Sequence, residues 1–289
     1  MATENQAGNN YEVSLAKNKP PSSIVQVGIV TKYEISNYFR ARRFFVLLAI
    51  ALLFGALFTF LIAHYGLPSG GTLGFYSEWW GRSATYIVIF SAIFFGGDAI
   101  SGEFQNKTGY FVVGNPIRRS SIYIGKWMAA LSASLIIMFV YAAIAVANGM
   151  YYFGTSIPNE FGESFAFTLV YLIAALGLTF LFSSMFKNSS FSIIVSVVLL
   201  LFVFGIVETL IAVFAHVEPW FLLSYGSEII SDVLMSPYPL HVTSITLGPR
   251  LGSFNSFNPT IPEGLEIMFA YFIVTAVLGL VLFERKEFN

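Results

Sequence analysis

Few side chains in this sequence have the type and spacing that chemistry requires. The histidines His64, His216 and His241 stand far apart and predict no metal site. The pair Gly125-Lys126 lacks the upstream glycine and the following serine or threonine of a phosphate-binding loop. The absence of cysteine excludes a thiolate nucleophile. We therefore expect that this chain is not an enzyme and has no catalytic, metal or cofactor site of its own.

Two acidic residues stand inside long apolar stretches, where a charge is costly and often functional. Glu208 lies 17 residues into the stretch 191–215, and Asp98 lies near the end of the stretch 83–100. Glu208 could bind a proton or a cation, or it could simply reach the outer membrane interface. We expect Asp98 to lie within reach of the inner interface.

The composition indicates that these two acidic residues lie on membrane-spanning helices. The 289 residues are 56% hydrophobic and only 11% charged, with a mean hydropathy of +0.73. A soluble globular protein carries about 25% charged residues. The formal net charge of -1 also argues against nucleic-acid binding, which needs an excess of basic residues. We predict an all-α integral membrane protein.

Uncharged or nearly uncharged stretches of about 20 residues predict membrane-spanning helices. Six such stretches form a predicted transmembrane domain over 44–289: about 44–63, 83–100, 127–148, 164–186, 191–215 and 265–283. With these spans, 13 of the 15 basic residues fall on one side of the membrane. The positive-inside rule then places both termini in the cytoplasm of a multi-pass protein of the cell membrane.

The segments outside the spans have distinct compositions. Residues 1–22 are polar and contain a Pro-Pro pair, which predicts a flexible leader. Residues 23–43 have apolar residues at roughly helical spacing and predict an amphipathic helix in the inner interface, in contact with membrane lipid. The polar residues of this helix are Lys32, Glu34, Arg40, Arg42 and Arg43. The alternative is an ordinary extension of the first span.

The longest predicted outer segment, 216–264, is unusually apolar for a loop. It either forms short helices that dip toward the membrane or cover an outer opening, or it packs as a surface loop on the ends of the spans.

The inner segment 101–126 has a pattern of its own between the second and third spans. An apolar run is stopped by Gly-Asn-Pro and bordered by charge, which suits docking onto a soluble partner. The alternative is a turn at the membrane surface whose arginines contact lipid. The candidate contact residues are Glu103, Thr108, Tyr110, Phe111, Pro116, Arg118 and Arg119.

At this segment the sequence resembles the permease subunits of type-2 ABC exporters. The matching positions are Asp98, Gly102-Glu103, Thr108, the run 110–113, Pro116, Arg119 and Gly125-Lys126; the family's glycine before the threonine is Lys107 here. The resemblance implies a transmembrane subunit that pairs with a second permease copy or a paralogue. It also implies two copies of a separate ABC ATPase subunit, which would carry the ATP and Mg²⁺ and dock beneath 103–119.

The function that follows is ATP-driven export by alternating access. The nearly uncharged, aromatic spans favour an apolar or amphipathic substrate. Two alternatives remain open at this point: a membrane-anchor or scaffold subunit of another complex, and an ion-coupled secondary transporter that uses Glu208.

Overall fold

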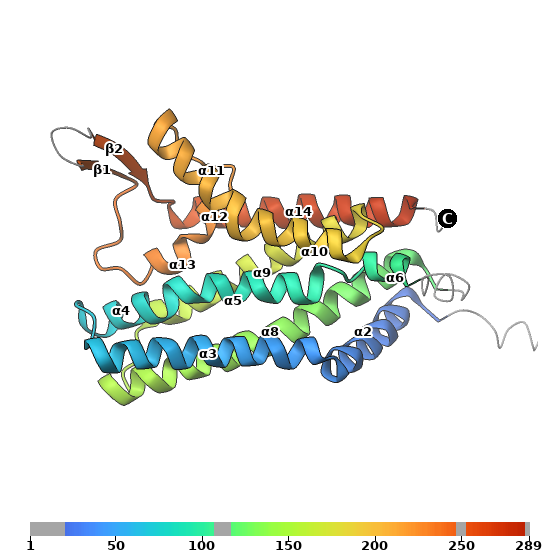
Figure 1. The fold of residues 1–289 in the computed structure, drawn as a ribbon, viewed down its shortest axis with the longest axis horizontal. Helices are drawn as coiled ribbons and strands as arrows, with labels where there is room; N and C mark the ends of the chain where they lie inside the picture. Colours follow the sequence, from blue (N-terminus) through green and yellow to red (C-terminus); the bar gives the residue numbers. More distant parts are fainter. Residues whose placement is uncertain (1–20, 107–116, 247–252, 287–289) are drawn as a thin grey trace, which may run out of the picture.

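The computed structural model describes residues 21–106, 117–246 and 253–286 of the chain (Figure 1). In these ranges, six helices are long and apolar enough to cross a membrane. They lie roughly parallel in one bundle (Figure 1). The prediction of an all-α integral membrane protein with six spans is therefore confirmed.

The element bounds in chain order begin with α2 Ser23–Arg40, α3 Arg42–Tyr65, α4 Gly71–Tyr76, η1 Ser77–Gly81, α5 Arg82–Gly96, α6 Ser101–Gln105, α8 Arg119–Phe153 and α9 Asn159–Met185. They continue with α10 Ser189–Val198, η2 Leu199–Val203, α11 Phe204–Leu210, η3 Ile211–Ala215, α12 Leu223–Ser227, α13 Ile229–Asp232, β1 Val242–Thr246, β2 Ser253–Phe257 and α14 Ile261–Arg285. The η elements are single π-helical turns within longer helices.

The bundle has two ends that we name by what they hold. Helix α2 and the C-terminal end of α14 lie at one end, which we call the terminal end (Figure 1). The strands β1 and β2 lie at the other, which we call the hairpin end (Figure 1). The strands pair antiparallel, with Val242 opposite Phe257 and Thr246 opposite Ser253.

Several helices extend beyond the predicted bounds. The second span runs over Gly71–Gln105, because α4, η1, α5 and α6 follow one another with only a short turn before α6. Its added first part is buried through Trp79 and Trp80. Helix α8 begins at Arg119, so 119–126 of the predicted inner segment are helical.

Helix α2 and the first span are separate helices. The backbone is extended at Ala41, where α2 has ended and α3 begins one residue later. Helix α2 lies at one end of the bundle and is inclined to the spans (Figure 1). Its exposed apolar residues Ile24, Ile29 and Tyr33 point away from the protein, which suits contact with lipid. The predicted leader, 1–22, lies almost wholly outside the described residues.

The segment between the fifth and sixth spans folds back onto the bundle. It contains α12, α13 and the two-stranded sheet, and the side chains of Leu223, Ile229 and Ile230 are buried. The segment has the short helices of the first alternative and packs against the bundle as in the second. That it dips toward the membrane or covers an outer opening stays a prediction.

Candidate functional site

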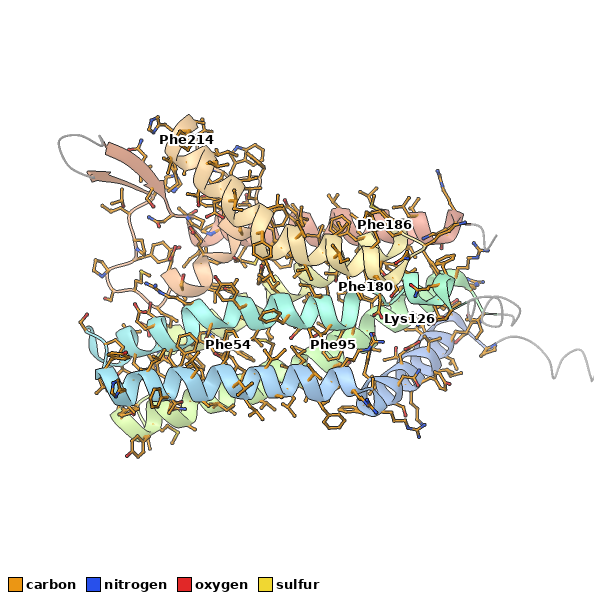
Figure 2. All side chains as sticks on the ribbon, viewed as in Figure 1. Phe54, Phe95, Lys126, Phe180, Phe186 and Phe214 are labelled. Atoms are coloured by element: carbon orange, nitrogen blue, oxygen red, sulfur yellow. The ribbon has the colours of Figure 1, made fainter. Side chains whose placement is uncertain are left out.

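A charged cluster at the terminal end joins three elements that are far apart in the sequence. The ammonium of Lys126 on α8 lies 2.5 Å from a carboxylate oxygen of Glu34 on α2 and 2.7 Å from one of Glu103 on α6. The three side chains are only 7%, 16% and 19% exposed, respectively. Figure 2 shows Lys126 where α8 passes between α2 and α6. We call these residues the Lys126 cluster.

Gly125 explains how α2 comes close enough to α8 for this contact. A Cβ atom at position 125 would lie 2.7 Å from the Cβ of Val30, so only glycine fits without a shift. The hydroxyl of Thr31 donates a hydrogen bond to the Gly125 carbonyl oxygen at 3.1 Å. The Gly-Lys pair thus has a structural role. Gly125 lets α2 approach α8 closely, and Lys126 forms an ion pair with Glu34 of α2.

Helix α6 is fixed to α9 by a serine hydroxyl. The backbone N–H groups of Ile100 and Ser101 both donate to Ser183 Oγ, each at 2.9 Å. These donors lie at the start of the short helix α6, where the first N–H groups of a helix have no acceptor within the helix itself. The backbone N–H of Ser189 also donates to Gln105 Oε1 at 2.7 Å. Glu103 is therefore presented by a helix that is held at both ends.

A second ion pair lies beside the Lys126 cluster. The guanidinium of Arg43 contacts Asp98 at 2.7 Å. This pair and the Lys126 cluster border a polar cavity of about 220 Å³. Burial raises the pKa of the Tyr38 hydroxyl, and the negative charges of Glu34 and Asp98 raise it further. The hydroxyl therefore stays protonated and donates to the Phe95 carbonyl oxygen at 2.9 Å. Asp98 is held by Arg43, the second residue of the first span.

The other predicted contact residues do not all join this cluster. Arg119 donates to the carbonyl oxygens of Glu284 and Lys286, so it binds the C-terminal end of α14. The backbone N–H of Arg118 donates to Gln26 Oε1. Of the polar residues predicted for the interfacial helix, Lys32, Arg40 and Arg42 are exposed. The remaining candidates lie outside the described residues: Thr108, Tyr110, Phe111 and Pro116.

Glu208 has a carboxyl partner that sequence reasoning missed. A hydrogen bond joins it to Glu228, which precedes α13, and both line a pocket of about 180 Å³ beneath β2. Burial raises the pKa of Glu228 to about 9, and the charge and hydrogen bond of Glu208 and the charge of Asp232 contribute. This pair can hold a proton between its carboxyl groups. The segment 216–264 offered no periodicity that would place Glu228 against Glu208.

Comparison with known proteins agrees with this architecture. A family model described as ABC-2 family transporter protein matches residues 6–288. The chain is also 30% identical over 108 residues to a protein named uncharacterized membrane protein YdbK, from Bacillus subtilis (strain 168). That match covers 35% of this chain and 44% of the relative, so the chain spans less than half of that relative's length.

The family match extends over nearly the whole chain, including every described helix. Permeases of this family are transmembrane subunits that work with an ABC ATPase and are not themselves catalytic. The chain is thus a multi-pass membrane protein and belongs to the ABC-2 family of transporter proteins.

Proposed function

We propose that this chain is the permease through which ABC ATPase subunits drive export, with the Lys126 cluster as the element that passes the ATPase movement to the helices. The observation that carries the proposal is the double contact of Lys126. One buried ammonium binds both Glu103, next to the predicted docking segment, and Glu34 on the interfacial helix.

The mechanical path follows from these contacts. A push on the segment around 103–119 reaches α6, which Ser183 ties to α9. It also reaches α8 directly, because Glu103 contacts Lys126 and α8 begins at Arg119. Helix α2 follows α8 through Gly125 and Glu34. The inner ends of the second and third spans then move together as one body, which suits a switch between two states.

In this proposal the terminal end faces the cytoplasm and the hairpin end faces outward across the cell membrane. Two ATPase copies dock at the terminal end and supply the ATP and Mg²⁺. A second permease copy or a paralogue completes the pathway. The first, fifth and sixth spans each have only 22% of their most apolar stretch buried, which leaves large faces for lipid and for that second copy.

The substrate class in this proposal is apolar or amphipathic. A cavity of about 520 Å³ between the start of the outer segment and α14 supports it. Its walls include Trp220, Phe221, Tyr271 and Val274, and Glu263 and Glu266 add two carboxyl groups. Such a mostly apolar site with a few polar groups is typical of small-molecule binding.

Charge reversal tests the proposal. Glu103→Lys and Arg119→Glu are produced with the cognate ATPase, and we measure co-purification and ATP-dependent transport in membrane vesicles. We expect both variants to insert and to lose docking or transport. The control is Arg82→Glu, because Arg82 is exposed at the opposite end of the second span and pairs only weakly with Glu78 at 3.4 Å.

The outcomes separate the alternatives. Unchanged co-purification and transport in both variants would overturn the proposal. Stable ATPase binding without any ATP-dependent transport in the wild type would favour a scaffold subunit. Transport that needs no ATP and disappears in Glu208→Gln would favour an ion-coupled carrier.

A further inference from the structure

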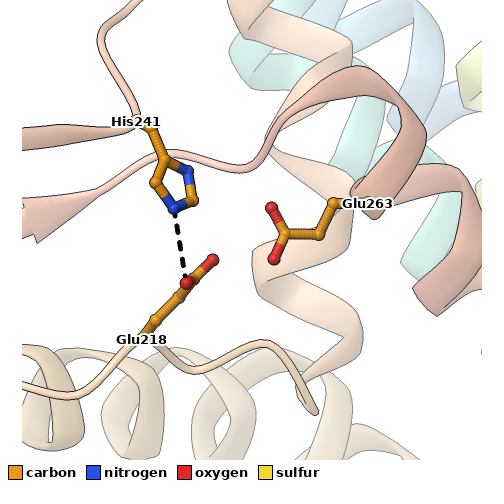
Figure 3. A group of neighbouring side chains, drawn as sticks. All are labelled: Glu218, His241 and Glu263. Atoms are coloured by element: carbon orange, nitrogen blue, oxygen red, sulfur yellow. Dashed lines mark ion pairs between the residues drawn. The ribbon is translucent and has the colours of Figure 1, made fainter.

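Three potential metal ligands converge at the hairpin end. Glu218 lies just after η3, His241 lies just before β1, and Glu263 lies in the first turn of α14. One ligand atom from each lies within 4.8 Å of the other two. Figure 3 shows the three side chains at the corners of a triangle, with Nε2 of His241 turned toward Glu218. This cluster is separate from the Glu208–Glu228 pair and from the Lys126 cluster.

A backbone carbonyl outside the cluster orients the imidazole. Nδ1 of His241 lies 2.9 Å from the carbonyl oxygen of Asn258. A carbonyl oxygen only accepts hydrogen bonds, so Nδ1 must carry the proton and donate it. In the neutral ring Nε2 then has a free lone pair, and this atom faces Glu218 Oε2 at 3.4 Å. Metal-binding histidines are oriented in this way, by a second hydrogen bond from the other ring nitrogen to a carbonyl.

The two carboxyl groups are each held by a partner as well. Glu218 Oε1 accepts a hydrogen bond from the Tyr225 hydroxyl at 2.6 Å. Glu263 Oε2 accepts one from the backbone N–H of Thr260 at 3.3 Å, as part of the capping box of α14. Each of the three side chains thus has one atom fixed by an outer partner, and the remaining atoms face one another within the cluster.

The two carboxyl groups are also hydrogen-bonded to each other, so they share a proton. A divalent cation bound among the three side chains would take the place of that proton. The ligand set, one nitrogen and two carboxylate oxygens, suits Zn²⁺ rather than Ca²⁺, which takes about six to eight oxygen ligands.

One of the three separations between ligand atoms matches such an ion, and all three lie within 4.8 Å. A tetrahedral ion with bonds of about 2.1 Å separates its ligand atoms by about 3.4 Å. The His241 Nε2 to Glu218 Oε2 distance is 3.4 Å.

We propose that Glu218, His241 and Glu263 form a binding site for Zn²⁺ or a closely similar divalent transition metal. Three protein ligands leave a fourth position for water. The ion connects the start of the segment 216–260, its middle and the first turn of the last span. It therefore fastens this segment over the hairpin end of the bundle. The site does not depend on an ATPase partner, so it stands or fails separately from the proposed function.

Metal titration tests the site. The full chain is purified in detergent through a tag without histidine, stripped with a chelator and dialysed. We expect it to take up one equivalent of Zn²⁺ in competition with a chromophoric chelator. Co²⁺ in place of Zn²⁺ should give the visible absorption of a tetrahedral complex. Zn²⁺ should also raise the unfolding temperature of the stripped protein, because it binds only the folded arrangement.

Two variants and two controls make the test specific. His241→Ala and Glu263→Gln should each weaken Zn²⁺ binding by about tenfold or more. Glutamine at position 263 can still complete the capping box, so the fold of α14 is preserved. His64→Ala and His216→Ala remove exposed histidines outside the cluster and should leave the affinity unchanged.

Either of two results would overturn the proposal. A wild-type chain that holds less than one equivalent would show that Glu218 and His241 form only an ion pair. Wild-type affinity in Glu263→Gln, a variant that keeps its fold, would show that the metal binds elsewhere.

Discussion

Replacing Lys126 with methionine should destabilise the protein by about 3 kcal/mol. Methionine keeps a stem of similar length but removes the positive charge between Glu34 and Glu103. Both carboxylates are less than one-fifth exposed and would face each other without their shared partner. Removing one partner of a buried ion pair costs about 3–5 kcal/mol. We take the lower bound, because the polar cavity of about 220 Å³ beside the cluster can admit water.

The assay compares unfolding in one detergent across matched variants. Lys32→Met serves as the control, because Lys32 is an exposed lysine on α2. Its substitution should change stability by less than about 0.5 kcal/mol. The triple variant Glu34→Gln, Glu103→Gln, Lys126→Met has no charge left in the cluster. It should recover most of the lost stability, since the cost comes from unpaired carboxylates rather than from lost packing.

Two results would refute this reasoning. Equal stability of Lys126→Met and Lys32→Met would mean that the cluster contributes nothing to the fold. A triple variant as unstable as Lys126→Met alone would mean that the lysine acts through packing of its stem, and that the ion pairs do not hold α2 and α6 to α8.

Three further predictions test the contacts around the two ends. Gly125→Ala should cost about 1–3 kcal/mol in unfolding experiments, because its Cβ would collide with α2, whereas Gly205→Ala, with no atom within 4 Å, should cost nothing. Ser183→Ala leaves two buried N–H groups unpaired and should cost about 2 kcal/mol or more. Ser184→Ala should be nearly neutral, because that hydroxyl has no hydrogen-bond partner in the described part of the chain. The pKa of Glu228 is raised from 4.5 to about 9 in the folded chain, so the folded chain binds more protons than the unfolded chain between these values. Stability should therefore fall as pH rises from about 5 to 9. Glu228→Gln should make the unfolding temperature nearly independent of pH over that range.

The spans could be predicted from the sequence because each is a long apolar run, but their bounds depended on contacts. The second span was expected to begin at Ser83, since Glu78 and Arg82 interrupt the apolar run. In the structure these two residues lie one turn apart on an exposed face, with Trp79 and Trp80 buried beside them. A charged pair on one face of a helix does not end the helix, and hydropathy alone could not show this.

The candidate site was predictable only in part, for a similar reason. Glu103 and the Gly125-Lys126 pair were recognisable as motif positions, but their contact with Glu34 depends on how α2 crosses α8. The Glu218, His241 and Glu263 cluster gave no signal, because 23 and 22 residues separate its members and no helix brings them together. Sequence spacing identifies ligands that lie on one helix or strand. These three residues instead come from the loop after η3, the residue before β1 and the first turn of α14.

Helix α8 connects the two ends, and its movement can be measured directly. It has 35 residues without a break, a length of about 52 Å at 1.5 Å per residue, and Lys126 lies near its start. If α8 moves as a rigid rod with α2 attached, probes at the exposed positions Ile24 and Tyr151 should keep their separation when ATP binds to the assembled transporter. Probes at Tyr151 and Leu240 should change theirs, because Leu240 belongs to the outer segment, which packs on other helices. The chain has no cysteine, so single-cysteine substitutions allow specific labelling for distance measurements. If the Ile24–Tyr151 distance changes as much as the Tyr151–Leu240 distance, α8 bends. The movement that starts at the Lys126 cluster would then reach only the inner half of the bundle.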